Sequence, residues 1–125
     1  MLTLLNDSVL NNSGTAIIDL IELLNQSSMQ NSGLIRLLEG GDLAGQSTVS
    51  NNETGTLELL DGTLNVLVDI ANAGQLQIDP NAILTLSGAT INGGTVTNDG
   101  VIDLIGAAAL KEWLAGQFRA VQCQR

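Results

Sequence analysis

A short motif, Asn-x-Gly-x-aliphatic-x-aliphatic, recurs along this 125-residue chain. Its glycines are Gly14, Gly33, Gly55, Gly74 and Gly100, so the motif returns about once per 20 residues. Internal repeats of this length are typical of solenoids, in which each repeat forms one coil and stacks on the next. The motif therefore predicts an all-β fold over residues 1–105, a parallel β-solenoid of about five coils, each of about 19–26 residues.

The residues that follow each glycine alternate as in a β-strand. Two and four positions on, all are apolar: Ala16, Ile18, Ile35, Leu37, Leu57, Leu59, Leu76, Ile78, Ile102 and Leu104. Three positions on, four of five are polar: Arg36, Glu58, Gln77 and Asp103, with Ile17 as the exception. Parallel stacking would align the apolar positions into aliphatic columns inside the coil. It would also place Arg36 beside Glu58 outside, a pair too weak to define the fold.

Asparagine precedes the glycine by two residues at Asn12, Asn31, Asn72 and Asn98. At Gly55 that position holds Glu53, and Asn51 and Asn52 stand just before it. Asn and Gly accept left-handed backbone angles, so the pair predicts a corner at which the chain turns into the strand. Asparagines stacked at such a corner can hydrogen-bond to one another along the solenoid axis, and this role requires no ligand.

A second strand follows in each coil, most clearly over 63–70 and 82–87, after turn sequences at 61–62 and 79–81. Two segments allow other structures. Residues 15–26 also fit a helical period, so a helix there is an alternative. In the longest coil, Asn92-Gly93-Gly94 would let residues 89–97 form a small hairpin or a third strand that bulges from the wall.

The tail, residues 106–125, differs from the repeats. It holds both aromatic residues, the only cysteine and three of the four basic residues. Its apolar residues fall on one face of a helix: Leu110, Trp113, Leu114, Phe118 and Val121. An open solenoid end exposes an aliphatic interior and unpaired strand edges, so we expect an amphipathic helix that caps it. The alternative is a disordered or non-native tail.

Composition limits the possible partners. Hydrophobic residues form 44% of the chain and aromatic residues 2%, which suits a narrow interior filled by aliphatic layers. A net charge of −9 disfavours binding to nucleic acids and to anionic membrane surfaces. The first residues lack the basic region and apolar stretch of a signal peptide, and no later segment has the length of a membrane span. We therefore expect neither an export signal nor membrane insertion in this chain.

The residues of most catalytic schemes are missing. The chain has no His and no Tyr, and Lys111 is its only lysine. Cys123 has no histidine to activate it. Acid–base chemistry would rest on carboxylates alone, Asp61, Asp69, Asp79, Asp99 and Asp103, of which Asp61, Asp79 and Asp99 fit turn positions. Neither an EF-hand loop nor the calcium-binding nonapeptide is present. We expect no catalytic residue, no cofactor and no metal.

Three segments carry a resemblance to a known family: Asn52-Glu53-Thr54-Gly55-Thr56-Leu57-Glu58-Leu59, Asn72-Ala73-Gly74-Gln75-Leu76-Gln77-Ile78 and Thr97-Asn98-Asp99-Gly100-Val101-Ile102-Asp103-Leu104. They resemble the repeats of bacterial exoproteins, the filamentous-haemagglutinin-like adhesins and autotransporter passengers. The resemblance covers about residues 11–105. It implies a right-handed parallel β-helix at the cell surface or secreted, which acts as a stalk or adhesive fibre and meets a host-surface or glycan ligand.

The leading hypothesis is a non-catalytic, structural or adhesion-type solenoid segment. One alternative is a carbohydrate-active β-helix that binds or cleaves polysaccharide, with a groove built from the outward residues Glu58, Asp69 and Asp103. Another is a β-helix scaffold that self-assembles end to end through its open coils.

Overall fold

The computed structural model describes the backbone of residues 2–114 and 117–121 and the side chains of residues 2–109. The described backbone consists of sixteen β-strands and contains no helix. The strands are β1 (Leu2–Leu4), β2 (Val9–Asn12), β3 (Thr15–Ile18), β4 (Ile21–Leu23), β5 (Ser28–Asn31), β6 (Leu34–Leu37), β7 (Gly40–Leu43), β8 (Thr48–Asn51), β9 (Thr56–Val66), β10 (Ile70–Asn72), β11 (Gln75–Ser87), β12 (Thr90–Asn92), β13 (Thr95–Asn98), β14 (Val101–Ile105), β15 (Ala109–Leu114) and β16 (Gln117–Val121).

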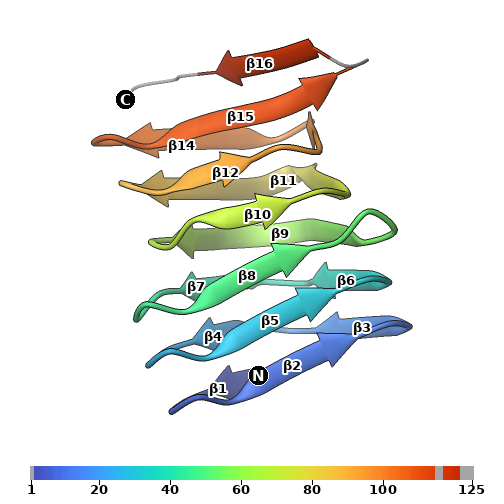
Figure 1. The fold of residues 1–125 in the computed structure, drawn as a ribbon, viewed down its shortest axis with the longest axis vertical. Coiled ribbons are helices and arrows are strands. Elements are labelled where there is room, and N and C mark those ends of the chain that lie inside the picture. The colour runs from blue at the N-terminus through green and yellow to red at the C-terminus, as the bar shows by residue number, and fades with distance from the viewer. Residues whose placement is uncertain (1, 115–116, 122–125) are drawn as a thin grey trace.

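The strands form two sheets that face each other along one axis (Figure 1). The front sheet contains β2, β5, β8, β10, β12, β15 and β16, and the rear sheet contains the other nine strands. In each coil the chain passes from a front strand through an asparagine corner to a first rear strand. It then crosses a rear bend to a second rear strand, and returns through a return corner to the next front strand. In β9 and β11 the two rear strands run through the bend as one.

The coil is right-handed and its strands are parallel. The front strands from β2 to β15 run to the right in Figure 1 and the rear strands run to the left, while the chain climbs from the N-terminal coil to the C-terminal one; β16 alone reverses direction in the front sheet. All pairs between coils are parallel; the shortest sequence step joins Leu84 to Ile102, and the longest joins Leu43 to Val66. The predicted parallel β-solenoid is therefore confirmed. The sequence separations between paired residues on adjacent coils are more even than the intervals between the motif glycines.

The repeat that was assigned to Gly100 is wrong. Val96, not Ile102, pairs with Leu76, while Ile102 pairs with Leu84 on the second rear strand. The residues from Asn92 to Gly94 thus form an ordinary asparagine corner between β12 and β13 rather than a hairpin or a bulge. Gly100 N donates a hydrogen bond of 3.0 Å to Asn98 Oδ1 in a local turn at the rear bend. The two kinds of turn share the same local chemistry, so the motif alone could not distinguish them.

The two helices considered from the sequence are not formed in the described backbone. Residues 15–26 contain β3 and β4, in which Ile18 and Ile21 are buried and Ile17 is 61% exposed. Within 106–125, β15 and β16 form an antiparallel pair, and β15 extends the front sheet beyond β12. The edge of β12 offers ladder hydrogen bonds along a whole strand, which a helix would leave unmade. The side chains of the predicted apolar helix face, and residues 115–116 and 122–125, lie outside the described part of the chain.

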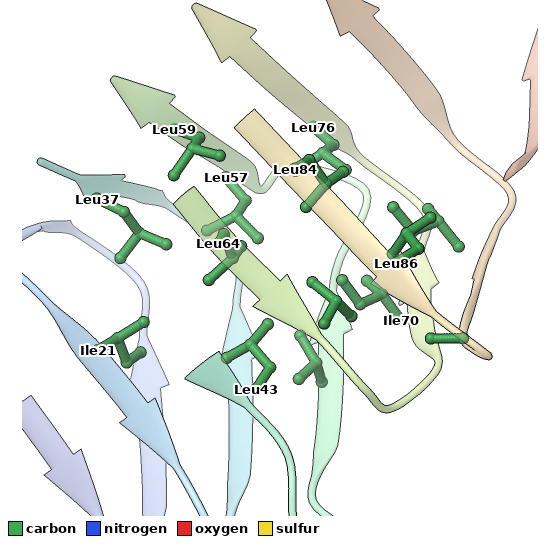
Figure 2. Close-up of a cluster of buried hydrophobic side chains, with 14 of the residues drawn as sticks. Ile21, Leu37, Leu43, Leu57, Leu59, Leu64, Ile70, Leu76, Leu84 and Leu86 are labelled. Atoms are coloured by element: carbon green, nitrogen blue, oxygen red, sulfur yellow. The ribbon is translucent and has the colours of Figure 1, made fainter. Parts of the chain in front are cut away.

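Aliphatic side chains fill the space between the sheets. Figure 2 shows the labelled leucines and isoleucines lying between the strands. Ile35, Leu57 and Leu76 form one predicted column, in register on consecutive coils and at most 2% exposed. Burying one such side chain stabilises the fold by about 1.5–3 kcal/mol. The predicted alternation of inward apolar and outward polar residues is confirmed in β6, β9 and β11.

Above the first coil, the motif glycines are required by the coil beneath them. A Cβ atom at Gly33 would fall on the carbonyl oxygen of Gly14, and one at Gly74 would fall on the carbonyl oxygens of Asn52 and Gly55. Neither glycine has a left-handed φ, so the constraint at this corner is close approach of two backbones rather than chain conformation. Gly14 belongs to the first coil, and a Cβ there would meet nothing within 4 Å.

This difference gives a matched test at equivalent motif positions. Gly33→Ala should lower the free energy of unfolding by about 2 kcal/mol or more, because the added methyl must displace backbone of the first coil. Gly14→Ala should change it by no more than about 0.5 kcal/mol. Urea unfolding followed by circular dichroism measures both. Equal effects of the two substitutions would contradict the steric explanation.

Candidate functional site

The asparagine corners are joined by a ladder of side-chain hydrogen bonds. Nδ2 of Asn12 donates to Oδ1 of Asn31, Asn31 donates in the same way to Asn51, and Asn51 to Asn72, each at 2.9 Å. The upper three asparagines are only 1–4% exposed. The stacking predicted from the sequence is confirmed for these residues. At the third coil the rung is Asn51, four residues before Gly55.

Each rung also holds the backbone of two coils. Asn51 Nδ2 donates to the carbonyl of Gly55 in its own corner at 3.2 Å and to the carbonyl of Gln75 in the next coil at 2.9 Å. Asn31 repeats this arrangement with Gly33 and Thr56. Buried polar groups are costly unless they are paired, and here the buried amides of Asn31 and Asn51 find partners on both coils. The ladder therefore fixes the corner and leaves its amide groups engaged.

The ladder ends at the fourth coil. Ala71 pairs with Asn92, so the position above Asn72 is Gly93, which carries no amide. Asn72 Nδ2 instead contacts the carbonyls of Gly93 and Thr95 at 3.4 and 3.3 Å. Asn98, which the motif placed in the ladder, is exposed and accepts the turn hydrogen bond from Gly100. The predicted rung at Asn98 is therefore wrong.

A shallow depression of about 750 Å³ opens at these upper corners, lined by residues 50–52, 71–73 and 92–95. Its walls are small and amide side chains, and no carboxylate lines it. The amides of Asn51 and Asn72 already donate within the fold. The depression can offer hydrogen bonds from the exposed amide of Asn92, whereas Asn52 Nδ2 already donates to Ser32 Oγ at 2.9 Å, and the depression lacks an acid–base pair.

A second set of stacked residues lies at the return corners, and sequence reasoning missed it. Asn6, Asn25 and Gly45 each begin a pair of consecutive left-handed residues, with φ between 54° and 69°. Asn25 Nδ2 donates to Asn6 Oδ1 at 3.4 Å, so this short ladder runs opposite to the first. The available signal was the succession of Asn-Asp-Ser, Asn-Gln-Ser and Gly-Gln-Ser, one in each of the first three coils.

The three carboxylates of the hypothetical polysaccharide groove serve separate parts of the fold. Glu58 pairs with Arg36 at 2.8 Å, which confirms the predicted neighbours, and this partly exposed pair contributes at most about 1 kcal/mol. Asp69 accepts a hydrogen bond from Thr90 N at 2.8 Å at a return corner. Asp103 lies on β14 and is 7% exposed. The three thus belong to a first rear strand, a return corner and a second rear strand.

The other predicted carboxylates also take local roles. Asp61 accepts from the following Gly62 N at 2.6 Å, and Asp79 accepts from Gln77 Nε2 at 3.0 Å. Both contacts lie at or near rear bends, as expected for turn residues. Asp99 is exposed at the rear bend before β14.

Two further carboxylates, Glu22 and Asp42, are neighbours on the outer surface of the rear sheet. Like charges on adjacent strands repel. Polar residues flank them on both sides: Thr3 Oγ1 donates to Glu22 Oε1 at 3.4 Å, and Asn65 Nδ2 donates to Asp42 Oδ1 at 2.9 Å. Sequence reasoning missed this pair because it lies on the second rear strand, outside the motif. Among the described residues, no three His, Cys, Asp or Glu side chains gather as metal ligands.

Comparison with protein-family models, with curated proteins and with solved structures found no match. In the part of the chain that the structure describes, no helix has the length and apolarity needed to cross a membrane. The coils and their ladders define the class of protein, a right-handed parallel β-solenoid with a buried asparagine ladder.

The ladder has a matched pair of asparagines for mutagenesis. Asn51→Ala should lower the free energy of unfolding by about 2–4 kcal/mol, because it removes several buried hydrogen bonds and leaves Asn72 Oδ1 without its donor and Asn31 Nδ2 without its acceptor in the ladder. Asn92→Ala should cost no more than about 0.5 kcal/mol, since its side chain is exposed. Thermal and urea unfolding report both values. A similar cost at the two positions would show that the ladder does not stabilise the corners.

Proposed function

We propose that this chain is a non-catalytic, structural or adhesion-type β-solenoid segment of a bacterial surface or secreted protein. The observation that carries the proposal is the repeated coil interface. Successive corners offer the same asparagine donor to the next coil, and successive strands the same backbone ladder. An interface that repeats without change lengthens by addition of coils, which is the property that a stalk or spacer needs.

The outer surface of the first rear strands supports contact with a broad partner. Polar side chains stand in register there on consecutive coils: Thr56, Glu58, Gln75, Gln77, Thr95 and Thr97. Their columns repeat at the strand spacing of about 4.8 Å, so a chain-like ligand could meet the same chemical groups several times. Many weak contacts of this kind give avidity without a deep pocket. A host-surface glycan, expected from the resemblance, fits this surface.

One experiment distinguishes glycan binding from polysaccharide cleavage. The purified chain is applied to an array of neutral and acidic polysaccharides and host-type glycans, and released reducing ends are measured in parallel. We expect saturable binding without release of sugars. The matched control is Leu67→Asp, at a return corner away from these columns, which should bind as the unmodified chain does. Release of reducing ends that is lost in Glu58→Gln would overturn the proposal in favour of a polysaccharide-cleaving enzyme. Absence of binding to every probe would remove the adhesive role.

The structural role predicts that a whole coil can be removed. Deletion of residues 31–50 joins Gln30 to Asn51, so that Asn51 takes the ladder position of Asn31 in register with Asn12. The shortened chain should keep its β-sheet circular dichroism, and small-angle scattering should show a long axis reduced by one strand spacing, about 4.8 Å.

A half-coil deletion supplies the control. Removal of residues 31–40 joins β5 of the front sheet to a second rear strand and breaks the order of corners. This variant should fail to fold. If both deletions unfold the protein, its coils are not interchangeable units and the role as an extendable segment is contradicted.

A further inference from the structure

The asparagine corner between β12 and β13 is one residue shorter than the corner beneath it. The strand register matches residues 70–75 of the lower corner with residues 91–95 of the upper one. The missing residue moves the asparagine out of the ladder. Gly93 lies above the buried Asn72, and Asn92 falls one position earlier, on the outward side of β12.

The side-chain amide of Asn92 is exposed, and among the described residues no hydrogen bond holds it. The ladder amides differ. Asn31 Nδ2, for example, donates to two carbonyls and to Asn51 Oδ1, while Asn31 Oδ1 accepts from Gly33 N. A carboxamide held in this way is kept from turning toward its own backbone, whereas the carboxamide of Asn92 is free to turn.

Glycine follows Asn92, and no other Asn-Gly pair occurs in the sequence. In deamidation, the backbone nitrogen of the next residue attacks the asparagine side chain, and a Cβ on that residue hinders the approach. Gly93 and Gly94 both have left-handed φ, 80° and 65°, so two residues without Cβ follow in succession. Sequence, exposure and backbone thus favour the same reaction at one asparagine.

Other asparagines that precede small residues are held by the fold. Asn12 and Asn31 precede serine, and Asn72 precedes alanine. The amides of all three donate hydrogen bonds within or at the end of the ladder. Asn98 Oδ1 accepts from Gly100 N at the rear bend. These amides must break their hydrogen bonds before they can react, so we expect deamidation of the folded chain at Asn92 first.

We propose that Asn92-Gly93 is a self-modification site, at which the folded chain deamidates without an enzyme. Gly93 N loses its proton and forms a bond to Asn92 Cγ, and the side-chain nitrogen leaves as ammonia. Water then adds to one of the two carbonyl carbons of the resulting succinimide and breaks its bond to the ring nitrogen. The product is aspartate or isoaspartate at position 92, and each carries one more negative charge than asparagine.

The reaction changes the depression at the upper corners. Asn92 is among its lining residues, and no carboxylate lines it, so the product supplies its first negative charge. Isoaspartate also inserts a methylene group into the main chain. The corner is held loosely there, because Asn72 Nδ2 contacts the carbonyls of Gly93 and Thr95 at 3.4 and 3.3 Å, against 2.9 Å between the rungs below. Isoaspartate therefore loosens the junction of β12 and β13.

Ageing of the purified full chain in water labelled with heavy oxygen tests the site. Peptide mapping by mass spectrometry follows each asparagine in folded samples at several pH values. We expect aspartate and isoaspartate at position 92 with one labelled oxygen, and a rate that rises about tenfold per pH unit, because the attacking nitrogen must lose its proton. Asn31 should react at least about tenfold more slowly in the folded chain than in urea, which removes the ladder.

Two substitutions at the same position serve as controls. Asn92→Gln keeps an exposed amide, but its longer side chain would have to close a larger ring, so position 92 should stay unmodified while the original chain reacts. Asn92→Asp carries the charge of the product without the altered main chain. Its melting temperature should match that of the fresh chain, whereas an aged sample enriched in isoaspartate should melt at a lower temperature.

An aged, folded chain that keeps asparagine at position 92, or one whose ladder asparagines react as fast as Asn92, would overturn the proposal. Equal reaction at position 92 in Asn92→Gln would also contradict it. If the isoaspartyl chain melts with the fresh chain, the corner is not loosened. None of these outcomes depends on whether the outer columns bind a glycan, so the modification site and the proposed function can fail separately.

Discussion

The backbone hydrogen bonds between parallel strands set the distance from one coil to the next at about 4.8 Å, and the rest of the structure follows from that distance. It brings the corner backbones so close that a Cβ at Gly33 or Gly74 would overlap the coil beneath. It also lets the Asn31 and Asn51 amides bond directly to each other at 2.9 Å. The aliphatic columns stack at the same repeat, so backbone, amides and core reinforce a single spacing.

Contacts between residues one coil apart were predicted correctly from the sequence. The predictions failed where the sequence did not show to which part of a coil a residue belongs. Alternation within each strand identified the inward Ile35 and Leu57 columns and the Arg36–Glu58 pair, because a period of two residues is local. Gly100 was misplaced because a turn at the rear bend uses the same Asn and Gly chemistry as a corner. In the tail, the apolar residues fit a helical period in the sequence, while the described backbone of β15 pairs with the edge of β12.

The candidate site also contains features that could be predicted from the sequence and features that could not. The asparagine ladder could be predicted because the residue type and its spacing suffice to specify it. The acidic groove could not, because Glu58, Asp69 and Asp103 share only an outward or turn position in the sequence, and their places depend on coil lengths that differ along the chain. Those differences fall at bends and corners, so they shift carboxylates around the circumference while the strands stay in register. The return-corner ladder depended on left-handed backbone pairs that Asp7, Gln26 and Gln46 adopt without glycine.

The register has a mechanical consequence. Every strand pair between coils joins residues one coil apart in the sequence, so each coil is held only by the coils directly above and below it. A pull along the axis loads the coil interfaces in series, so the weakest interface separates first. A coil that detaches releases about 20 residues, or roughly 70 Å of extended chain, and this slack relieves the load on the remaining interfaces. Such a segment extends under load one coil at a time, in steps of similar size, while its remaining coils stay folded.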